Sequence, residues 1–273
     1  MDLEVLLAAL SDLPIGQVRF LERIDSTNSE ARRWIEKGAP DLALVVADEQ
    51  TAGRGRQGRK WFTPPGAALA FSLVLRQAMV PSNDPDGQII PALSMRLTAL
   101  GALAVCQAIR KRYNLLTEIK WPNDVLLQRR KLAGVLVEAQ WQGDQLQAAI
   151  LGIGINIAPD SVPVAGGLLY PATCLQKALR RPVDRIALLH DVLDEILSWR
   201  NKINEPDFLN TWEALLAFKG EWMIVYENDP AGSASRQGIV LGLDDQGRLR
   251  LKDRSGEEFR LLTGELRLRP VAS

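Results

Sequence analysis

The order of strand-like and helix-like runs constrains the fold of this chain most strongly. Up to Phe218, apolar runs with strand character alternate with runs of helical spacing, whereas beyond Lys219 only short alternating runs follow. This order predicts an α+β domain over residues 1–218 and a small C-terminal β-barrel domain over residues 219–273. The boundary between the two domains is expected near Lys219.

The expected strands of the larger domain cover residues 17–24, 42–48, 67–75, 119–127, 132–141 and 146–157, and the expected helices cover 94–113, 185–202 and 206–218. Thr27 and Glu30 have the spacing of a capping box, which predicts that a further helix begins there and that Gly38 ends it. The segment from Thr51 to Lys60 is rich in glycine and basic residues, which predicts a mobile loop. The smaller domain is expected to have strands over residues 221–226, 238–243 and 248–252.

Composition restricts the class of protein. With 47% hydrophobic and 24% charged residues, the chain can bury enough apolar surface to fold as a soluble globular protein. Lys and Arg number 33, as do Asp and Glu, so no global field favours nucleic acid or a membrane as a partner. The separated Cys106 and Cys174 indicate free thiols in a reducing cytoplasm, and one histidine, His190, cannot build a zinc cluster. We find no secretory signal or membrane span at the N-terminus.

The loop from Gly53 to Lys60 is the first segment with a chemical pattern. Its glycines allow backbone amides to approach an anion closely, and the guanidinium groups of Arg54, Arg56 and Arg59 offer bidentate contacts to phosphate or carboxylate. A nucleotide clamp is therefore one interpretation. A solvated basic loop or an RNA-binding patch explains the same residues equally well.

Three further segments carry weaker patterns. Lys120-Trp121-Pro122-Asn123-Asp124 could hold a triphosphate and its magnesium, although these residue types taken alone favour an ordinary β-turn with Pro at its second position. The run from Arg130 to Glu138 places Lys131 before an apolar strand in which Gly134 permits close approach to the backbone. Gly152 and Gly154 alternate with aliphatic residues in a strand that ends on Asn156, without the spacing of a dinucleotide-binding motif.

Taken together and in order, these segments resemble the biotin protein ligase family. The matching segments are Asp25-Ser26-Thr27-Asn28, the run from Asp48 to Trp61, Lys120-Trp121-Pro122-Asn123-Asp124, Arg130-Lys131-Leu132-Ala133-Gly134 and Gly152-Ile153-Gly154-Ile155-Asn156. The resemblance extends from about Val18 to the C-terminus. It implies a mixed β-sheet packed with helices, as in class II aminoacyl-tRNA synthetases and biotin ligases, plus a small C-terminal β-barrel.

The resemblance also implies an activity. A member of this family activates biotin with ATP and Mg²⁺ to biotinyl-5′-AMP, and then transfers biotin to a lysine of a biotin carboxyl carrier protein, a domain of acetyl-CoA carboxylase or a related carboxylase. The cations of the motifs fit this chemistry, because a carboxylate and a phosphate must be brought together. The adenylate is sensitive to water, so we expect the loop to become ordered over bound ligand.

Site residues follow from the resemblance, motif by motif. Biotin contacts are expected from Ser26, Thr27, Asn28, Gln50, Arg54, Gly55, Arg56 and Lys131. ATP contacts are expected from Arg59, Trp61, Asn123, Asp124 and Asn156. Lys131, Arg56 and Lys120 are the expected catalytic residues, no protein metal-ligand set is expected, and Asp124 is expected to orient either the metal or the incoming lysine.

Two other functions stay open at this point. A lipoate or octanoate attachment enzyme shares the fold of the family, and an RNA-binding protein could use the basic loop as its patch. Some family members carry an N-terminal DNA-binding module, but only about two dozen residues precede Ile24, so we expect no operator binding. An exposed sheet edge in this fold could pair with itself in a homodimer.

Overall fold

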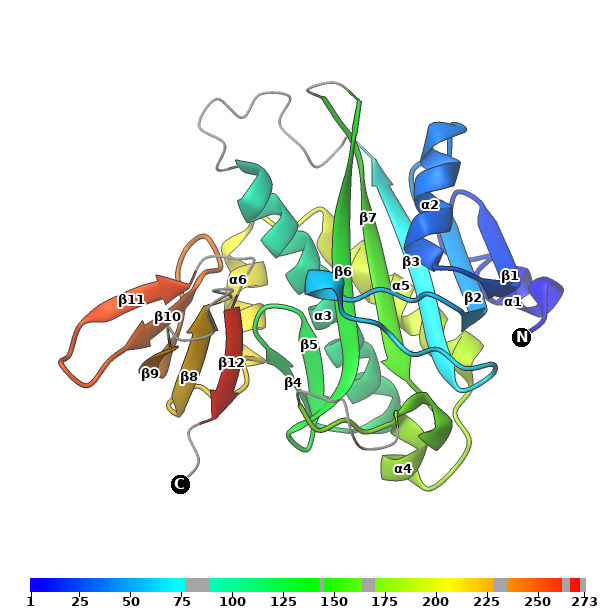
Figure 1. Cartoon of the computed structure of the whole chain (residues 1–273). Coiled ribbons are helices and arrows are strands. Elements are labelled where there is room, and N and C mark those ends of the chain that lie inside the picture. Colours follow the sequence, from blue (N-terminus) through cyan, green and yellow to red (C-terminus); the bar gives the residue numbers. More distant parts are fainter. Residues whose placement is uncertain (77–88, 143–144, 164–169, 228–234, 262–265, 271–273) are drawn as a thin grey trace.

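A seven-stranded mixed sheet forms the centre of the computed structural model, which describes residues 1–76, 89–142, 145–163, 170–227, 235–261 and 266–270. The strands lie in the order β1-β2-β3-β7-β6-β5-β4, as Figure 1 shows. Their bounds are β1 Val18–Ile24, β2 Leu44–Gln50, β3 Ala68–Arg76, β4 Thr117–Lys120, β5 Asp124–Leu127, β6 Arg130–Gln142 and β7 Gln145–Asn156. The pair β1 and β2 is parallel and the other neighbours are antiparallel, so the predicted mixed sheet is confirmed.

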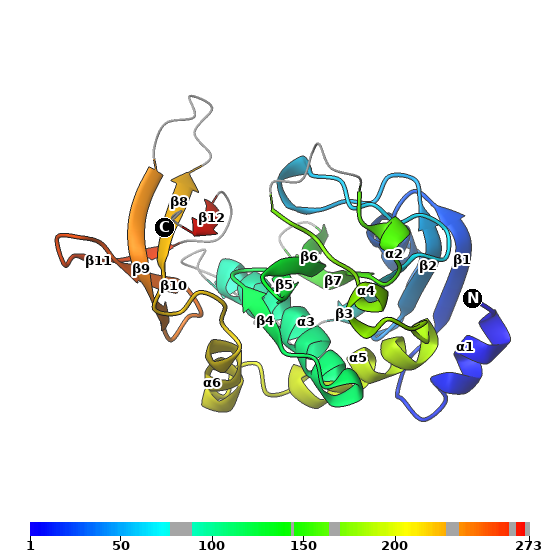
Figure 2. The ribbon, with the colours of Figure 1, turned by 90° about the horizontal axis from the view of Figure 1, so that it is seen from below.

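Helices cover both faces of this sheet (Figure 2). They are α1 Leu3–Ala9, α2 Thr27–Glu36, α3 Ile89–Tyr113, α4 Leu175–Leu179, α5 Arg185–Arg200 and α6 Pro206–Ala214. Because side chains alternate along a strand, Leu44 and Val46 of β2 join the large core under α3 and α5, whereas Val45 joins the smaller core under α2. The central strands are therefore apolar on both faces.

The longest helix, α3, is a core helix. Residues 92–113 are long and apolar enough to cross a membrane by length and composition, but 78% of the most apolar window is buried in the protein. It packs against β6 on one side and α5 on the other. Its apolar composition is thus explained by burial inside a globular domain.

A second, five-stranded antiparallel sheet follows, and it confirms the predicted all-β C-terminal domain. Its strands are β8 Trp222–Glu227, β9 Ser235–Leu243, β10 Leu249–Lys252, β11 Glu258–Leu261 and β12 Leu266–Pro270, in the order β11-β10-β9-β8-β12. The boundary at Lys219 stays a prediction. Lys219 itself forms a bridge with Val240 of β9.

Two predicted elements of the larger domain are wrong in extent. The single strand expected over residues 119–127 is a hairpin, because the chain reverses at Trp121-Pro122-Asn123 and Lys120 pairs with Asp124. The helix expected to run to Phe218 ends at Ala214. Residues 215–217 instead lie along the edge of β4, where Ile119 donates its N–H to Leu215 at 2.7 Å and accepts from Ala217 at 2.9 Å.

The predicted capping box at the start of α2 is also wrong. Ser26 is the N-cap and makes no side-chain cap hydrogen bond. The amide of Thr27 donates to Gln50 Oε1 at 2.9 Å, and Glu30 accepts from arginine side chains. The Thr27 amide is therefore engaged with β2, and Glu30 with Arg19 of β1 and Arg33 of α2, rather than with each other in a capping box. Gly38, at φ 87°, ends the helix as predicted.

Replacement of Gly101 tests how closely α3 lies on the sheet. A Cβ atom at this position would lie 2.9 Å from Val135 Cγ1 and 3.0 Å from Leu151 Cδ1. We expect Gly101→Val to lower the free energy of unfolding by about 1–3 kcal/mol, because the core would be overpacked. Denaturant unfolding should show a lower midpoint with an unchanged slope. A midpoint equal to that of the wild type would contradict this packing.

Candidate active site

The floor of the candidate site is a patch of bare backbone on β6 and β7. Gly134 pairs with Gly154, and Gly152 pairs with Leu136 across the same two strands. A Cβ atom at Gly152 would lie 2.1 Å from Asn28 Oδ1, and one at Gly154 would lie 2.3 Å from Trp61 Nε1. Side chains from two other elements therefore rest directly on the sheet, which explains why these strand positions are glycines.

A cavity of about 470 Å³ opens above this floor. All of the site residues expected from the sequence line it: Ser26, Thr27, Asn28, Gln50, Arg54, Gly55, Arg56, Arg59, Trp61, Lys120, Asn123, Asp124, Lys131 and Asn156. They come from segments up to 130 residues apart in the chain, as the spacing from Ser26 to Asn156 shows. The structure brings them together in one cavity, while their roles stay predictions.

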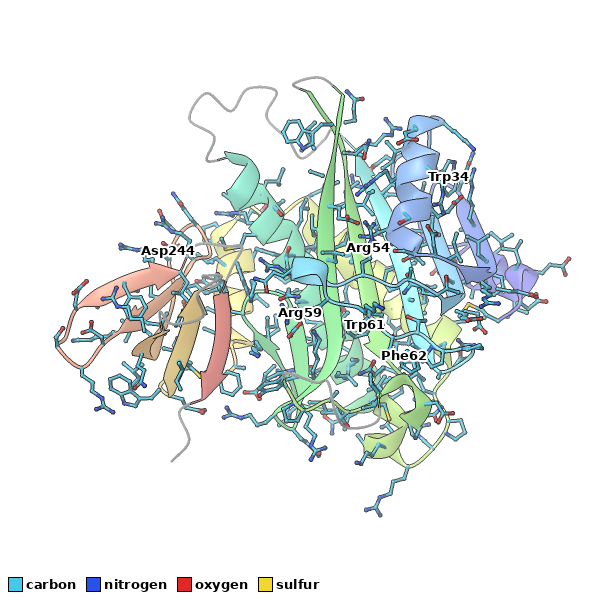
Figure 3. The ribbon with its side chains drawn as sticks, viewed as in Figure 1. Trp34, Arg54, Arg59, Trp61, Phe62 and Asp244 are labelled. Atoms are coloured by element: carbon cyan, nitrogen blue, oxygen red, sulfur yellow. The ribbon has the colours of Figure 1, made fainter. Side chains whose placement is uncertain are left out.

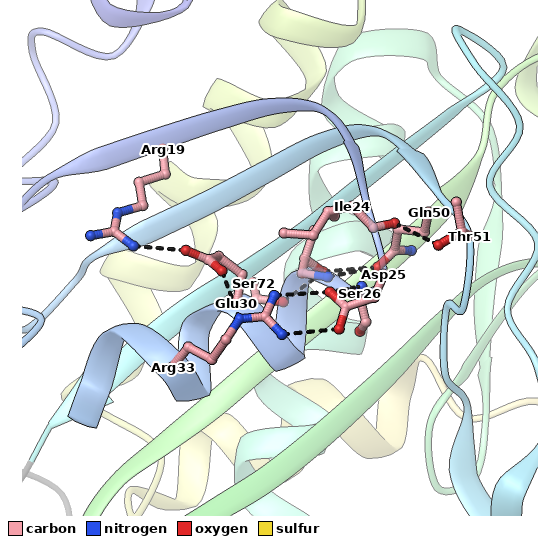
Figure 4. A network of polar contacts seen from close by, with 10 residues as sticks. Arg19, Ile24, Asp25, Ser26, Glu30, Arg33, Gln50, Thr51 and Ser72 are labelled. Carbon is pink, nitrogen blue, oxygen red and sulfur yellow. Dashed lines mark hydrogen bonds and ion pairs between the residues drawn. The ribbon is translucent and has the colours of Figure 1, made fainter. Parts of the chain in front are cut away.

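One wall of the cavity is a chain of neutral polar groups. The Ser72 hydroxyl lies 2.6 Å from Asn28 Oδ1 and 2.8 Å from Thr27 Oγ1. Gln50 accepts from the amide of Thr27 and donates its Nε2 to Thr63 Oγ1 at 2.9 Å. Figure 4 shows Ser26, just before α2, together with Gln50 of β2 and Ser72 of β3. This wall can offer several directed hydrogen bonds to a compact polar ligand group.

The sequence interpretation missed Ser72. It is fully buried in β3, and its neighbours on that strand, Phe71 and Leu73, are apolar. A lone hydroxyl inside an apolar strand is the signal that could have identified it, because a buried polar group needs a partner. Thr63 was missed as well, and it lies beyond the loop motif, where nothing in the sequence singles it out.

The arginine-glycine loop crosses the same face of the sheet (Figure 3). It folds back on itself: Trp61 donates its amide to Gly53 at 2.9 Å and Gly55 donates to Arg59 at 2.7 Å. Gly53 leaves no room for a side chain, since a Cβ atom would lie 2.4 Å from the carbonyl oxygen of Trp61. The loop thus has a hairpin-like form that directs its basic side chains toward the cavity.

Basic side chains meet at the other end of the cavity. Lys131 Nζ lies 2.5 Å from Asp124 Oδ1, and Lys120 Nζ lies 4.0 Å from the ring centroid of Tyr170. Burial lowers the pKa of Arg56, an effect that nearby Asp124 opposes. An arginine with a lowered pKa still carries its charge at neutral pH. The cavity thus presents a desolvated cation cluster that can attract and hold anionic groups.

Asn123 and Asn156 have structural partners in addition to lining the cavity. Asn123 donates its Nδ2 to Val135 at 3.1 Å, and Asn156 donates its Nδ2 to Thr173 at 3.0 Å. These bonds fix the orientation of each amide and leave its oxygen and its second Nδ2 hydrogen for other partners. His190, by contrast, lies on α5 and contacts Asp12 at 3.0 Å, outside the set of cavity-lining residues.

The Asp25 carboxylate, next in sequence to the cavity residue Ser26, gives a pH prediction. Hydrogen bonds from Arg33 lower its pKa from 3.8 to about 2 (Figure 4). A carboxylate that is more acidic in the folded state stabilises the fold above its unfolded pKa. That contribution is lost as the pH falls from about 4 to about 2.

We therefore expect Arg33→Gln to raise the pKa of Asp25 toward 3.8. The unfolding free energies of wild type and variant should differ at pH 5 and converge near pH 2. NMR titration of the Asp25 side chain measures the shift directly. A pKa that is the same in both proteins would contradict the assigned role of Arg33.

Comparison with known proteins shows relatives of this chain. Residues 20–156 match the biotin/lipoate A/B protein ligase family. The chain is 35% identical over 243 residues to the biotin--[acetyl-CoA-carboxylase] ligase of Paracoccus denitrificans, a match that covers 87% of this chain and 95% of the relative. It is 32% identical over 239 residues to the ligase of the same name from Mycobacterium tuberculosis, covering 85% of this chain and 82% of the relative.

The fold is also similar to solved structures. A biotin protein ligase from Aquifex aeolicus, solved in complex with biotin and ATP, superposes with a TM-score of 0.76 and 27% sequence identity. The superposition covers 93% of this chain and 99% of the ligase. Sequence matches above 30% identity that span most of both proteins, together with this shared fold, show that the chain belongs to the biotin/lipoate A/B protein ligase family.

Proposed function

We infer that this protein is an ATP-dependent biotin protein ligase, which forms biotinyl-5′-AMP and transfers biotin to a lysine of a carrier protein. The observation that carries this inference is the cavity with two chemically different ends. A neutral, directed hydrogen-bonding wall lies at one end and a cation cluster at the other. The relatives named as biotin--[acetyl-CoA-carboxylase] ligases, and the similar ligase solved with biotin and ATP, support it.

Biotin matches the two ends of the cavity. Its ring head is a neutral urea with one carbonyl acceptor and two N–H donors, and its tail ends in a carboxylate. We assign the head to the wall of Ser26, Thr27, Asn28 and Gln50. The tail then reaches the cations, where Arg56 and Lys131 are the groups that meet the carboxylate. A neutral head and an anionic tail are each placed where the partner groups lower their free energy.

Charge governs the first half-reaction. A carboxylate oxygen of biotin attacks the α-phosphorus of ATP, a P–O bond breaks, and pyrophosphate leaves. Two anions must approach, so fixed cations in a desolvated cavity lower the barrier by stabilising the charge that develops on the transferring group. Lys131 is the proposed catalytic cation at the reacting atoms, with Arg56 and Lys120 beside it. Its contact with Asp124 would hold the Lys131 ammonium group in place.

Magnesium fits the cavity as a partner of ATP. Within the residues that the structure describes, no group of three or more His, Cys, Asp or Glu side chains could hold a metal ion. Mg²⁺ is commonly held by substrate phosphates with one or two carboxylates. Asp124 is the carboxylate that lines the cavity and could take that part. When bound, the ion would neutralise phosphate charge.

In the second half-reaction, a carrier lysine attacks the carbonyl carbon of the mixed anhydride. The amine must be neutral, a C–N bond forms, and AMP leaves with its charge held by the same cations. The proposed partner is therefore a biotin carboxyl carrier domain, in keeping with the names of the relatives.

The remaining assignments concern location and assembly. We propose a cytoplasmic enzyme, because Cys106 and Cys174 are buried free thiols. The outer edge of β4 pairs with residues 215–217, whereas β1 ends the sheet on the other side. A homodimer through the β1 edge is thus open to a test by light scattering. The absence of operator binding also stays a prediction, which a gel shift at physiological salt measures.

Pyrophosphate exchange tests the proposed activity. With ATP, magnesium and biotin, we expect exchange in the wild type and a loss of about 10²- to 10³-fold in Lys131→Ala, because a cation at the reacting atoms is removed. The exposed Lys37, far from the cavity, provides the matched control Lys37→Ala, which should exchange normally.

The choice of acid separates the alternatives. Exchange with lipoate or octanoate but not with biotin would agree with the family assignment and would reject biotin as the substrate. No exchange with any of these acids would reject adenylation and favour binding of RNA to the basic loop.

The C-terminal domain is joined to the nucleotide end of the cavity by a buried hydrogen bond. Trp121 donates its indole N–H to Gly247 in the β9–β10 turn at 3.0 Å, and Arg96 of α3 donates to Asp245 at 2.9 Å. Trp121 lies between Lys120, a proposed catalytic cation, and Asn123, which we assign to ATP. The C-terminal domain therefore supports the ATP-binding turn rather than the biotin-binding wall.

Trp121→Phe tests this connection by removing the donor while keeping an aromatic ring. We expect the KM for ATP to rise by about 2- to 10-fold, the effect of one hydrogen bond, with the Kd for biotin unchanged. Trp222→Phe, in the exposed part of the same domain, is the control. An unchanged KM for ATP, or a parallel loss of biotin affinity, would contradict the proposed role.

A further inference from the structure

We propose that Glu138 is a positioning residue which fixes the hydrogen-bond direction of the biotin wall and at the same time anchors the arginine-glycine loop. Glu138 lies on β6, at the end of the run that begins at Arg130. It is not among the residues that line the cavity, and no role in the chemistry described above falls to it. The proposal rests on the proposed function and explains how the wall and the loop are held in position before biotin binds.

The Glu138 carboxylate is shared by three donors, two from α2 and one from the arginine-glycine loop. Its Oε2 accepts from Asn28 Nδ2 at 2.7 Å and from Arg54 Nη2 at 2.8 Å. Its Oε1 accepts from Arg32 Nη2 at 3.0 Å. The side chain is 20% exposed, so these bonds are partly shielded from water. One oxygen atom therefore connects the wall, through Asn28, to the loop, through Arg54.

An ionised carboxylate only accepts hydrogen bonds, and this gives the wall its direction. The amide of Asn28 must turn its NH₂ group toward Glu138, so its Oδ1 faces Ser72. An amide oxygen has no hydrogen, hence the Ser72 hydroxyl donates to it across 2.6 Å. The single hydrogen of Ser72 is then used, so the hydroxyl hydrogen of Thr27 goes to one of two interior acceptors, Ser72 Oγ at 2.8 Å or Gln50 Oε1 at 3.2 Å. Each hydrogen-bond direction in this series follows from the Glu138 carboxylate, which can only accept.

The result is a wall that presents acceptors at two positions. Asn28 Oδ1 and Thr27 Oγ1 keep lone pairs that can face the cavity, whereas their hydrogens are committed inside the protein. Gln50 accepts from the Thr27 amide and donates one Nε2 hydrogen to Thr63, so its second hydrogen is the donor left for a ligand. Two acceptors beside a donor match the two N–H groups and the carbonyl of a cyclic urea.

The second half of the role concerns the loop. Arg54 begins the basic part of the loop, and its ion pair with Glu138 neutralises its charge and ties it to β6. Arg54 is thereby a structural anchor, and the anion-binding function passes to Arg56 and Lys131. Loss of the Glu138 charge should therefore loosen the loop while it also lets the Asn28 amide turn.

Glu138→Gln removes the charge at constant shape. Without ATP present, we expect the Kd for biotin, measured by calorimetry, to rise by about 10- to 100-fold, the range for loss of a charged hydrogen-bond partner. Glu30→Gln is the matched control, because Glu30 also accepts from two arginines and is 16% exposed, but it does not line or contact the cavity. Its Kd for biotin should stay within about twofold, and both variants should have similar unfolding midpoints.

Two further variants separate the wall from the loop. In an Asn28→Ala background, Glu138→Gln should raise the Kd for biotin by a clearly smaller factor than in the wild type, because the effect through Asn28 is already lost and only the effect through the loop remains. Hydrogen exchange of residues 53–60 should speed up in Glu138→Gln. It should not change in Ser72→Ala, which breaks the wall, leaves the loop anchor intact and should also raise the Kd.

The outcomes distinguish this role from the activity itself. A wild type that fails to bind biotin would overturn the proposed function and this role with it. Normal binding by the wild type together with an unchanged Kd in Glu138→Gln would overturn only the role of Glu138. Additive effects of Glu138→Gln and Asn28→Ala would show that Glu138 does not act through the wall.

Discussion

The site depends on a place where two neighbouring strands carry no side chains. Gly152 and Gly154 of β7, with Gly134 opposite on β6, leave the backbone bare on one face of the sheet. Asn28 and Trp61 can then lie on the sheet itself, and the cavity forms between them. A side chain at Gly152 or Gly154 would displace them, so both the polar wall and the closed form of the loop follow from this bare floor.

Hydrogen-bond direction and charge then divide the cavity between two kinds of ligand group. The wall has its donors and acceptors fixed by interior partners, which favours one orientation of a neutral polar head. The cations at the other end are partly desolvated and are held near Asp124, which strengthens their attraction for anions. Biotin and ATP together need both ends of the cavity. The neutral head of biotin requires the polar wall, and the biotin carboxylate and the ATP phosphates require the cations.

The sequence predicted which helices and strands form better than it predicted where they end. It also identified the motif residues better than the residues that hold them in place. Strand alternation and the glycine-arginine loop were readable because local residue types determine them. The reversal at Trp121 agrees with the β-turn interpretation of Lys120 to Asp124, although the strand was expected to run through it. The early end of α6 was not readable, because residues 215–217 leave the helix to pair with the edge of β4, which is a tertiary partner. Ser72 and Glu138 were missed for the same reason, since each acts through a residue more than 40 positions away. The order of the motifs still indicated the right cavity.

The most direct measurement is the intact mass of a carrier domain after incubation with this protein, ATP, magnesium and an equal mixture of biotin, lipoate and octanoate. A carrier domain with one acceptor lysine, and its variant with that lysine replaced by arginine, provide the substrate and the control. We expect the mass of one biotinyl group on the first and no change on the second. A lipoyl or octanoyl adduct, or an unmodified carrier, would contradict the account.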